Sequence, residues 1–586
     1  MINLKNHKIT IFLTAFIFIY FSIILYSGYF SDDSYSSQIK GALAYENKNL
    51  LDYTIKTIFG WVIGSGRLLI LSTFQYFIFY FIENLFLYKF FIILLLIINF
   101  QLFNKLNYEI TNSKNYSIYI TIFSILSIQL REYHDPVLAF HGFLIVLSIL
   151  FFLQLLLLIE YTKNYNKTLL YISLIIFGIC HFMYELAFTF LFLNLIFLQI
   201  KDANLKKNIH ILKFYFFVFL FAIFIFLILQ IRVHFFSTNQ APDYKIFTNL
   251  FDIFFYPKIL LIQILSALPG VYFSSIFEEI VFDKFLIFFV SIIFSSFLIF
   301  MFISMKAGIF INIKNEKKSV INRRSILLYS ILLFSIPASI ILISSHNEYL
   351  LTKGIGYGYI FNFFSCYGFG YIIYFILISL NKLSKFFIIG PIIILFFFNS
   401  LSNVNTVLKS NIVYKYPDKI FLDASRKGLF NELNDKSILI RHMKYPSDFK
   451  WNFYSKLNIK LNIIDLANPS EKNFLDLIEN GKINKLNNNQ FEIKFLNNKI
   501  WISHYFYDIK GRNNGQYILA EVDKLIYEKA TNKIIKVETK NLKIFQQYKN
   551  KIYGVNLDRN IDFIKLIFQK NQNPTKYFLH FDLYQY

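Results

Sequence analysis

Two adjacent carboxylates, Asp32 and Asp33, follow the first apolar run of the chain, which extends from Ile9 to Tyr26. Ionised side chains at a membrane boundary are costly, so a pair of them suggests a function. A carboxylate that faces water there can take a proton from an acceptor hydroxyl, and a pair can hold a divalent ion. The competing interpretation is structural, because acidic residues are common and stabilising at the start of a helix.

A second polar cluster lies between two later apolar runs. Five polar residues occupy positions 131–141: Arg131, Glu132, His134, Asp135 and His141. A short loop between two membrane helices would bring Asp135 to the same membrane face as Asp32. Asp135 and His134 offer ligand types that suit Mg²⁺, Mn²⁺ or Zn²⁺, so they are candidate metal ligands. The alternative is that Asp135 caps a helix whose first residue is Pro136.

This arrangement resembles the membrane-embedded glycosyltransferases with the C-type fold, which use polyprenyl-phosphate-linked sugars. Asp32-Asp33 matches the position of the first-loop acidic pair in the aminoarabinose and protein-mannosyl transferases, and Asp135-Pro136 matches their second-loop Asp-Pro. The stretch from Trp61 to Arg67 is similar to the Trp-x(n)-Gly-Arg segment of the O-antigen glucosyltransferase group. The resemblance covers about residues 10–160.

The resemblance implies that a first-loop carboxylate is the catalytic base, and we favour Asp32 over Asp33. The base would take the acceptor proton, and a cation would balance the lipid phosphate that leaves the anomeric carbon. The candidate cations are Arg67, Arg131 and Lys353, with a divalent metal as the alternative. Gly64 and Gly66 would let backbone approach a phosphate beside Arg67. Both arginines have a simpler interpretation, in which they extend to lipid headgroups.

Composition places these residues in a polytopic helical membrane protein. Of the 586 residues, 56% are hydrophobic and 20% aromatic, and the apolar runs are continuous. The net charge of +23 comes largely from lysines, many of them between apolar segments, where they set orientation, so we do not expect a nucleic-acid partner. Cys180 and Cys366 lie in separate apolar runs and predict neither a disulfide framework nor a thiolate metal cluster.

Residues 1–400 are predicted to form a transmembrane catalytic domain of about 11 spanning helices in the C-type arrangement. We read the first apolar run as a retained helix rather than a cleaved signal. Basic loops, above all Lys306–Arg324, would face the cytoplasm. The spans are expected to begin near Ile9, Lys89, Tyr116, Val137, Thr168, Leu186, Ile209, Lys284, Ser325, Gly358 and Phe386.

The composition changes near Leu401, where Asn, Lys, Asp and Glu become frequent. Short alternating stretches such as Phe491–Phe495 and Lys533–Val537 indicate strands, and turn signals such as Asn480-Gly481 separate them. Residues 401–586 are therefore predicted to form a soluble α/β or α+β domain. An odd number of preceding spans would place this domain outside the cytoplasm.

These observations predict a glycosyltransferase of the plasma (inner) membrane that acts on its outer face. The donor would be a polyprenyl-phosphate sugar, and the acceptor a cell-surface glycan or glycolipid such as O-antigen or lipopolysaccharide. One alternative is an envelope glycan polymerase or ligase, a class that usually relies on arginines in large outer loops. The other is a lipid-linked-sugar transporter or flippase, although transporters place ionisable groups near the midplane and often show paired halves.

Overall fold

The computed structural model divides the chain into two compact units. The helical unit comprises Met1–Asp33 and Leu50–Lys409, and the C-terminal unit comprises Ser34–Asn49 and Ser410–Tyr586. The chain therefore passes between the units three times. The structure describes residues 4–30, 32–67, 69, 76–131, 135–201, 205–236, 256–271, 286–293, 295, 323–339, 362–379, 382–441, 450–465, 471–496, 500–506, 515–547 and 549–555.

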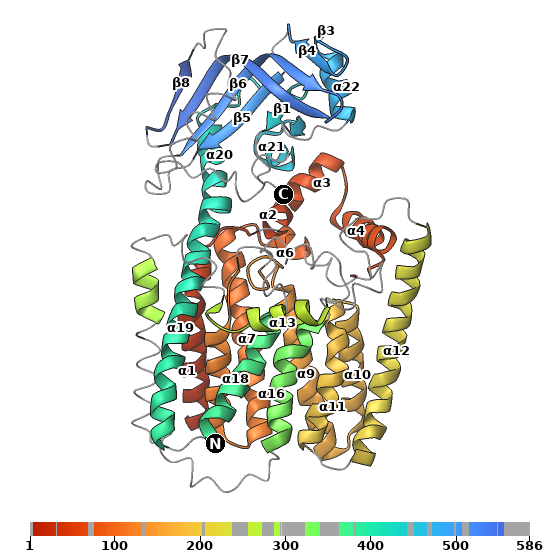
Figure 1. Cartoon of the computed structure of the whole chain (residues 1–586), viewed down its shortest axis with the longest axis vertical. Helices are drawn as coiled ribbons and strands as arrows, with labels where there is room; N and C mark the ends of the chain where they lie inside the picture. Colours follow the sequence, from red (N-terminus) through yellow and green to blue (C-terminus); the bar gives the residue numbers. More distant parts are fainter. Residues whose placement is uncertain are drawn as a thin grey trace. The chain divides into compact units, whose positions relative to one another are not determined.

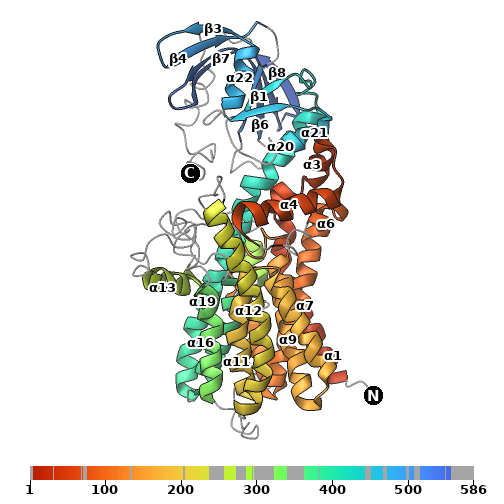
Figure 2. The same cartoon turned by 90° about the vertical axis from the view of Figure 1, so that its right-hand side faces the viewer.

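The helical unit is a set of helices that run roughly side by side, with α13 lying across their ends (Figures 1 and 2). Its elements are α1 (Leu4–Phe21), η1 (Ser22–Tyr26), α4 (Leu50–Ser65), α6 (Tyr76–Phe81), α7 (Leu85–Thr111), α8 (Lys114–Ser127), α9 (Phe143–Asn164), α10 (Lys167–His181), η2 (Glu185–Thr189), α11 (Phe190–Lys201), α12 (Leu205–Phe236), α13 (Tyr256–Ser266), α16 (Arg323–Ser339), α18 (Asn362–Ser379) and α19 (Lys382–Ser410).

Polar side chains tie the central helices together. Buried Asn99 on α7 donates a hydrogen bond to Ser148 on α9 and accepts one from Tyr367 on α18. Further along the same two helices, Tyr371 on α18 donates to buried Asn107 on α7. Such interhelical bonds are a recurrent way to fix helix packing where lipid gives little hydrophobic driving force.

The number of spanning helices differs from the sequence-based prediction. Among the described residues, four helices are long and apolar enough to cross a membrane: Leu85–Thr111, Phe143–Asn164, Ile209–Val233 and Ile389–Ser410. Five shorter apolar helices accompany them: Thr10–Tyr26, Lys167–His181, Glu185–Ile200, Ser325–Ser339 and Asn362–Leu377. The predicted fold class, with about 11 spans in the C-type arrangement, is therefore wrong.

The prediction failed because hydropathy does not report where the backbone leaves the helix. Helix α8 stops at Ser127 after 14 residues, although Ile128 and Leu130 continue the apolar run. Helix α10 likewise stops at His181 after 15 residues. Both fall short of the roughly 20 residues that span a bilayer. The expectation that the C-terminal domain lies outside the cytoplasm depended on an odd number of spans. Because that number is wrong, the expectation has no basis in the helix count.

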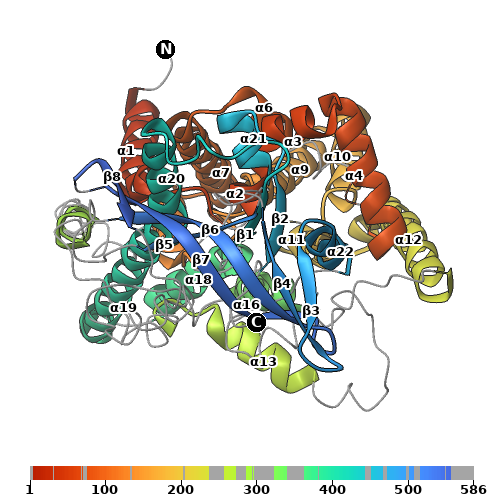
Figure 3. The same ribbon diagram turned by 90° about the horizontal axis from the view of Figure 1, so that it is seen from above.

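The C-terminal unit is built on one mixed sheet (Figure 3). Its strands run in the order β2-β1-β5-β6-β4-β3, and β7 pairs with both β6 and β8. Strand β1 is parallel to β2 and β5, whereas the remaining pairs are antiparallel. The strands are β1 (Ile438–Arg441), β2 (Asn462–Asp465), β3 (Lys482–Lys485), β4 (Gln490–Lys494), β5 (Ile500–Phe506), β6 (Gln516–Glu528), β7 (Lys533–Gln546) and β8 (Lys551–Val555).

The stretches expected to be strands, Phe491–Phe495 and Lys533–Val537, overlap β4 and β7. One face of the sheet buries a core of aliphatic residues that includes Ile440, Ile502 and Ile518. The helical elements of this unit are α2 (Asp32–Ser36), most of which lies in it, α3 (Ile39–Glu46), η7 (Asn411–Lys415), α20 (Tyr416–Arg426), α21 (Lys450–Leu457) and α22 (Glu471–Glu479).

Candidate functional site

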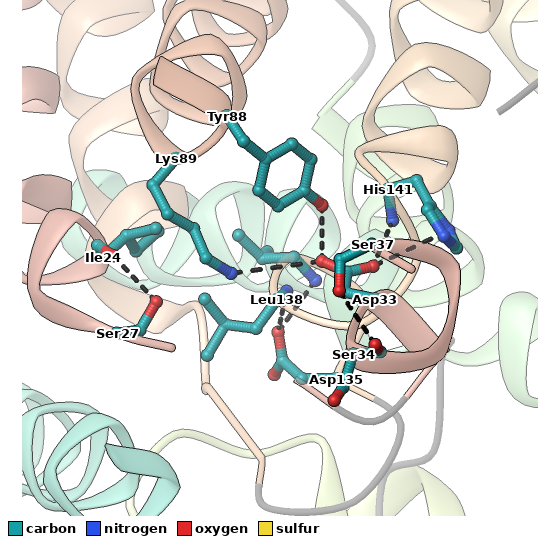
Figure 4. A network of polar contacts seen from close by, with 11 residues as sticks. Ile24, Ser27, Asp33, Ser34, Ser37, Tyr88, Lys89, Asp135, Leu138 and His141 are labelled. Carbon is teal, nitrogen blue, oxygen red and sulfur yellow. Dashed lines mark hydrogen bonds and ion pairs between the residues drawn. The ribbon is translucent and has the colours of Figure 1, made fainter. Parts of the chain in front are cut away.

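The acidic pair opens helix α2, and its two carboxylates have different environments. Asp33 is fully buried, whereas Asp32 is only half-buried. Tyr88 donates its hydroxyl hydrogen bond to Asp33 Oδ2, and the backbone N–H of His141 donates to Asp33 Oδ1 at 2.9 Å. Lys89 Nζ lies 3.9 Å from Asp33 Oδ2. Figure 4 shows these side chains converging on Asp33 from separate elements.

Helix α7 supplies two of these groups from its first turn. Asn84 caps the helix, because its side-chain oxygen accepts hydrogen bonds from Phe86 N and Leu87 N at 2.9 and 3.2 Å. The cap fixes the start of α7, and Tyr88 and Lys89 follow in the next positions. Both side chains are fully buried. The first turn of α7 therefore presents a hydroxyl and a cation to the carboxylate.

A left-handed turn delivers the third group. His141 and Gly142 have φ angles of +53° and +73°, just before α9 begins at Phe143. Such angles are easy for glycine and uncommon for histidine, so the surrounding contacts must hold the turn. A Cβ on Gly142 would come within 2.7 Å of Leu95 Cδ1, so a side chain there would have to displace the end of the Leu95 side chain. The turn directs the His141 N–H at Asp33.

Burial dominates the electrostatics of this cluster. It raises the pKa of Asp33 to about 7, against the opposing effects of Lys89, Tyr88 and the His141 N–H. Burial also lowers the pKa of His141 to about 3, so its ring is neutral at physiological pH. When Asp33 is ionised, its negative charge lies 3.9 Å from the ammonium of Lys89. The neighbouring carboxyl of Asp32 adds to the rise in the pKa of Asp33.

Asp135 acts as the cap of a turn. Its Oδ1 accepts hydrogen bonds from Val137 N and Leu138 N at 2.8 and 2.7 Å, and its Oδ2 accepts one from Arg131 N at 2.6 Å. The carboxyl is fully buried, and burial raises its pKa to about 6 against these three backbone donors. Its hydrogen bonds account for the carboxylate without a metal. The second named metal ligand, His134, lies outside the described residues.

Arg131 is buried and faces the protein interior. Its guanidinium donates to Gln129 Oε1 at 2.9 Å and to the carbonyl of Ser266 at 2.7 Å. Within the described ranges, no three His, Cys, Asp or Glu side chains come close enough together to hold a metal ion. The prediction that a divalent metal takes part stays a prediction.

Helix α19 supports the non-helical segment that leads to Arg131. Asn399 Nδ2 donates to the carbonyls of Leu126 and Ile128 at 2.8 and 2.7 Å. Asn403 Nδ2 donates to Ile128 O at 2.8 Å, and its Oδ1 accepts from Leu130 N at 2.7 Å. Irregular backbone within an apolar bundle needs such internal partners. These two asparagines thus fix the segment from which Arg131 and Asp135 project.

Arg67, the first candidate phosphate ligand, is already bound to a carboxylate. Its Nε and one terminal nitrogen donate to the two oxygens of Glu185 at 2.6 and 2.7 Å. The guanidinium also lies 5.8 Å from the ring centre of Trp61 and 5.5 Å from that of Tyr184. The third candidate, Lys353, lies outside the described residues.

A small hollow adjoins this ion pair. It has room for about one water molecule. Its walls are mostly apolar, with Glu185 and His181 as the polar members. The lining residues are Leu69, His181, Phe182, Glu185, Phe188, Ala222 and Phe226.

Two of these functional groups were not singled out from the sequence: Tyr88 and Lys89. His181 and Glu185 were singled out as a polar lining one helical turn apart, but the partner of Glu185, Arg67, was not predicted. A lysine at the start of an apolar run is ordinarily read as a membrane-boundary residue, so Lys89 gave no separate signal. Glu185 lies 118 positions from Arg67, and no local pattern predicts their pairing. Comparison with protein-family models finds no family that matches the chain, and comparison with curated proteins finds no match.

The arrangement suits proton transfer at a protein surface. Asp33 is held by three groups, the Tyr88 hydroxyl and Lys89 ammonium of α7 and the backbone N–H of His141, and Asp32 is its neighbour at the start of α2. Asp32 is the carboxylate of the pair that keeps some exposure. A general base needs such access to its substrate together with a fixed position.

Proposed function

We propose that this protein is a membrane glycosyltransferase. It transfers a sugar from a polyprenyl-phosphate donor to a cell-surface glycan or glycolipid on the outer face of the plasma membrane. The observation that carries the proposal is the carboxylate pair at the start of α2, in which a buried, charge-matched Asp33 holds a more exposed Asp32 in place. The four apolar helices of spanning length support a membrane location. The proposal does not depend on the C-type fold.

In the proposed reaction, Asp32 takes the proton from the acceptor hydroxyl. The hydroxyl oxygen forms a bond to the anomeric carbon as the bond from that carbon to the phosphate oxygen breaks. The electron pair of the broken bond stays with the lipid phosphate, whose negative charge increases. A general base of this kind typically contributes about 10²- to 10⁴-fold in rate.

The leaving phosphate needs a positive partner, and Arg67 is the candidate with the better access. Its side chain is 15% exposed, whereas Arg131 is 3% exposed and bound to a backbone carbonyl. A phosphate at Arg67 has to share the guanidinium with Glu185 or displace it. Since guanidinium binds carboxylate and phosphate in the same forked geometry, such an exchange is chemically straightforward. Lys353 and a divalent metal remain further candidates for this role.

The test is a transfer assay with the purified full-length protein. It is incubated with a panel of radiolabelled polyprenyl-phosphate sugars and envelope extract, with and without a metal chelator. Transfer by the wild type, and its loss in Asp32→Asn, would support the proposal. The matched control is Asp52→Asn, which changes an exposed aspartate in the first turn of α4 and should retain full activity. Loss of transfer in the chelated wild type would identify the metal as the cation.

The strongest alternative is a transporter of lipid-linked sugars. Buried ion pairs inside a helical bundle, such as Asp33 with Lys89, are common in transporters. A transporter would move the labelled lipid across reconstituted vesicles without breaking the sugar–phosphate bond. Movement without transfer, for every donor in the panel, would therefore favour the transporter. Joining of whole lipid-linked glycans would instead favour a polymerase or ligase.

A further inference from the structure

Helix α4 (Leu50–Ser65) carries a stripe of exposed apolar side chains. The stripe consists of four residues that are each between 42% and 58% exposed, and we call it the α4 ridge: Leu51, Ile55, Phe59 and Ile63. Residues four positions apart lie on one face of a helix, so these side chains are neighbours along it. The buried residues of α4, Thr54 and Ser65, are both polar. The helix thus turns four large apolar side chains outward, which indicates a partner or a membrane surface.

Helix α4 lies across the ends of the upright helices of its unit, and not alongside them (Figures 1 and 2). Its C-terminal end is fixed on α12, because Gln230 Nε2 donates to the carbonyl oxygens of Ser65 and Gly66 at 3.1 and 3.0 Å. Gly66 has a φ angle of +65°, and a Cβ there would lie 2.9 Å from the carbonyl oxygen of Leu229. Such a close approach needs glycine. The contact between α4 and α12 is therefore a built one, and it lies within the helical unit.

The contact with α12 gives the level of α4 relative to a bilayer. The part of α12 that is long and apolar enough to cross a membrane is Ile209–Val233, and only 11% of its apolar stretch is buried inside the protein. Gln230 lies three residues before the end of this span, which corresponds to about 4.5 Å along the helix axis. The end of α4 therefore meets a largely uncovered apolar helix near the level where the hydrocarbon gives way to headgroups.

The distribution of charge along α4 agrees with this level. Asp52 and Lys56 lie in its first two turns, whereas the stretch from Thr57 to Ser65, which leads to α12, contains no charged residue. Charged side chains in an interfacial helix extend to the headgroups while the apolar face enters the hydrocarbon. Lipid would cover the α4 ridge and the outer face of α12 together. A protein partner at the ridge would have to stop at the lipid around α12, so lipid is the simpler occupant.

We infer that α4 is an interfacial membrane helix whose ridge is covered by the hydrocarbon chains of the adjacent lipid leaflet. Helices of this kind lie in the membrane plane, with the apolar face about 5–10 Å inside the headgroup boundary. Arg67 follows α4 directly, and its backbone N–H donates to the carbonyl of Trp61 at 3.3 Å. Lipid at the ridge thus lies beside the segment that carries Arg67. That a lipid-linked phosphate reaches Arg67 from this leaflet rests on the proposed function, whereas the lipid contact itself does not.

The test identifies the medium that surrounds the ridge in the full-length protein. The protein is reconstituted into vesicles of phosphatidylethanolamine and phosphatidylglycerol, and a nitroxide spin label is attached at Phe59→Cys or Ile63→Cys. The native Cys180 and Cys366 are buried, and the unsubstituted protein gives the background labelling. Oxygen concentrates in hydrocarbon, whereas a hydrophilic nickel chelate stays in water. The ratio of the two collision rates therefore distinguishes lipid from water.

Two further variants provide the references. Phe217→Cys is the matched lipid reference, because Phe217 is 67% exposed within the spanning part of α12. Lys485→Cys, at an exposed position of β3, is the water reference. The ratio of oxygen to nickel collisions at Phe59→Cys and Ile63→Cys should be several-fold higher than at Lys485→Cys and should approach that at Phe217→Cys.

Two results would overturn the inference. A ratio at both ridge positions equal to that at Lys485→Cys would mean that the ridge faces water. Protection of both positions from both reagents would mean that protein covers the ridge, whether a second copy, another chain or a different part of this one. The measurement needs no substrate. If the wild type transfers no sugar and the ridge positions still report lipid, the proposed function fails and the interfacial helix stands.

Discussion

Asp32 and Asp33 are neighbours in sequence but differ in their burial. Asp33 is fully buried, accepts two hydrogen bonds and lies 3.9 Å from the ammonium of Lys89. Asp32 keeps partial exposure. The two should therefore respond differently to the same substitution, Asp to Asn, which preserves size and removes charge.

We expect Asp32→Asn to lower transfer by about 10²- to 10⁴-fold with little change in thermal stability, because an amide cannot take the acceptor proton. Asp33→Asn should instead destabilise the protein by about 3–5 kcal/mol, since it leaves Lys89 as a buried charge without its carboxylate. Thermal unfolding in detergent and initial transfer rates measure the two effects. Equal loss of stability in both variants would show that Asp32 is also a structural residue.

The pH dependence of stability offers a second test at this scale. The pKa of Asp33 is raised to about 7 from 3.8, so the folded protein binds the proton more tightly and stability falls as pH rises through that window. The pKa of His141 is lowered to about 3 from 6.5, so its contribution rises with pH over nearly the same range. In the wild type, the change of stability with pH contributed by Asp33 therefore opposes the one contributed by His141.

Replacing either residue should therefore reveal how the other makes the unfolding temperature depend on pH. Asp33→Asn should make the unfolding temperature rise more steeply between pH 4 and about 6.5 than in the wild type. His141→Gln should make it fall with pH over the window up to about 7. Parallel pH curves for the wild type and both variants would mean that neither group titrates as its burial requires.

Glu185 provides a third prediction. Its carboxylate occupies one edge of the Arg67 guanidinium, Nε and one terminal nitrogen, to which a phosphate could also bind. Glu185→Gln should therefore tighten binding of polyprenyl phosphate by several-fold to about tenfold, because the competing negative charge is gone. Arg67→Gln should weaken binding. Equilibrium binding of a fluorescent polyprenyl phosphate measures both, and unchanged affinity in both variants would remove Arg67 from the donor site.

The sequence identified part of this site and missed the rest for a physical reason. Asp32, Asp33 and Asp135 stood out because charged residues are rare beside apolar runs. Tyr88 and Lys89 did not, because only the packing of α7 against the turn at His141 makes them partners of Asp33. Tertiary contacts between distant segments leave no periodic pattern in a single sequence.

At the scale of elements, the sequence predicted the positions of the helices better than their lengths. Apolar runs predicted helices near Lys89, Thr168 and Ser325, and the structure has α7, α10 and α16 there. The length of each helix depends on where polar side chains replace its backbone hydrogen bonds. After α8 this replacement comes from Asn399 and Asn403, which lie more than 270 positions away. Hydropathy therefore overestimated the number of spans.

The two asparagines give a prediction at this scale. Asn403→Leu removes the acceptor of Leu130 N and a donor to Ile128 O, so it should destabilise the protein by about 1–3 kcal/mol. Ile394→Leu on the same helix changes an exposed side chain and should be close to neutral. Thermal unfolding of both variants is the measurement. A neutral Asn403→Leu would show that the segment after α8 does not depend on α19.

At the scale of the whole molecule, the composition of the C-terminal unit constrains membrane topology without counting helices. Residues 34–49 pack in one compact unit with residues 410–586, and a bilayer cannot pass through a packed unit. We therefore expect residues 34–49 of the first loop and the C-terminal domain to lie on the same side of the membrane. Helix α7 has 27 residues and is therefore about 40 Å long, which exceeds the thickness of the hydrocarbon core.

The far end of α7 is marked by Glu109, which accepts a hydrogen bond from Lys163 at the end of α9. The start of α10 at Lys167 should thus lie across the membrane from the first loop. Single cysteines at Ala44, Lys485 and Lys167, all exposed positions, test this arrangement in a background whose own Cys180 and Cys366 are buried. An impermeant maleimide applied to intact cells should label Ala44→Cys and Lys485→Cys, and should label Lys167→Cys only after permeabilisation. Labelling of Ala44→Cys and Lys485→Cys from opposite sides would contradict the compact unit. If both label only after permeabilisation, the shared side stands, and the proposed action on the outer face is wrong.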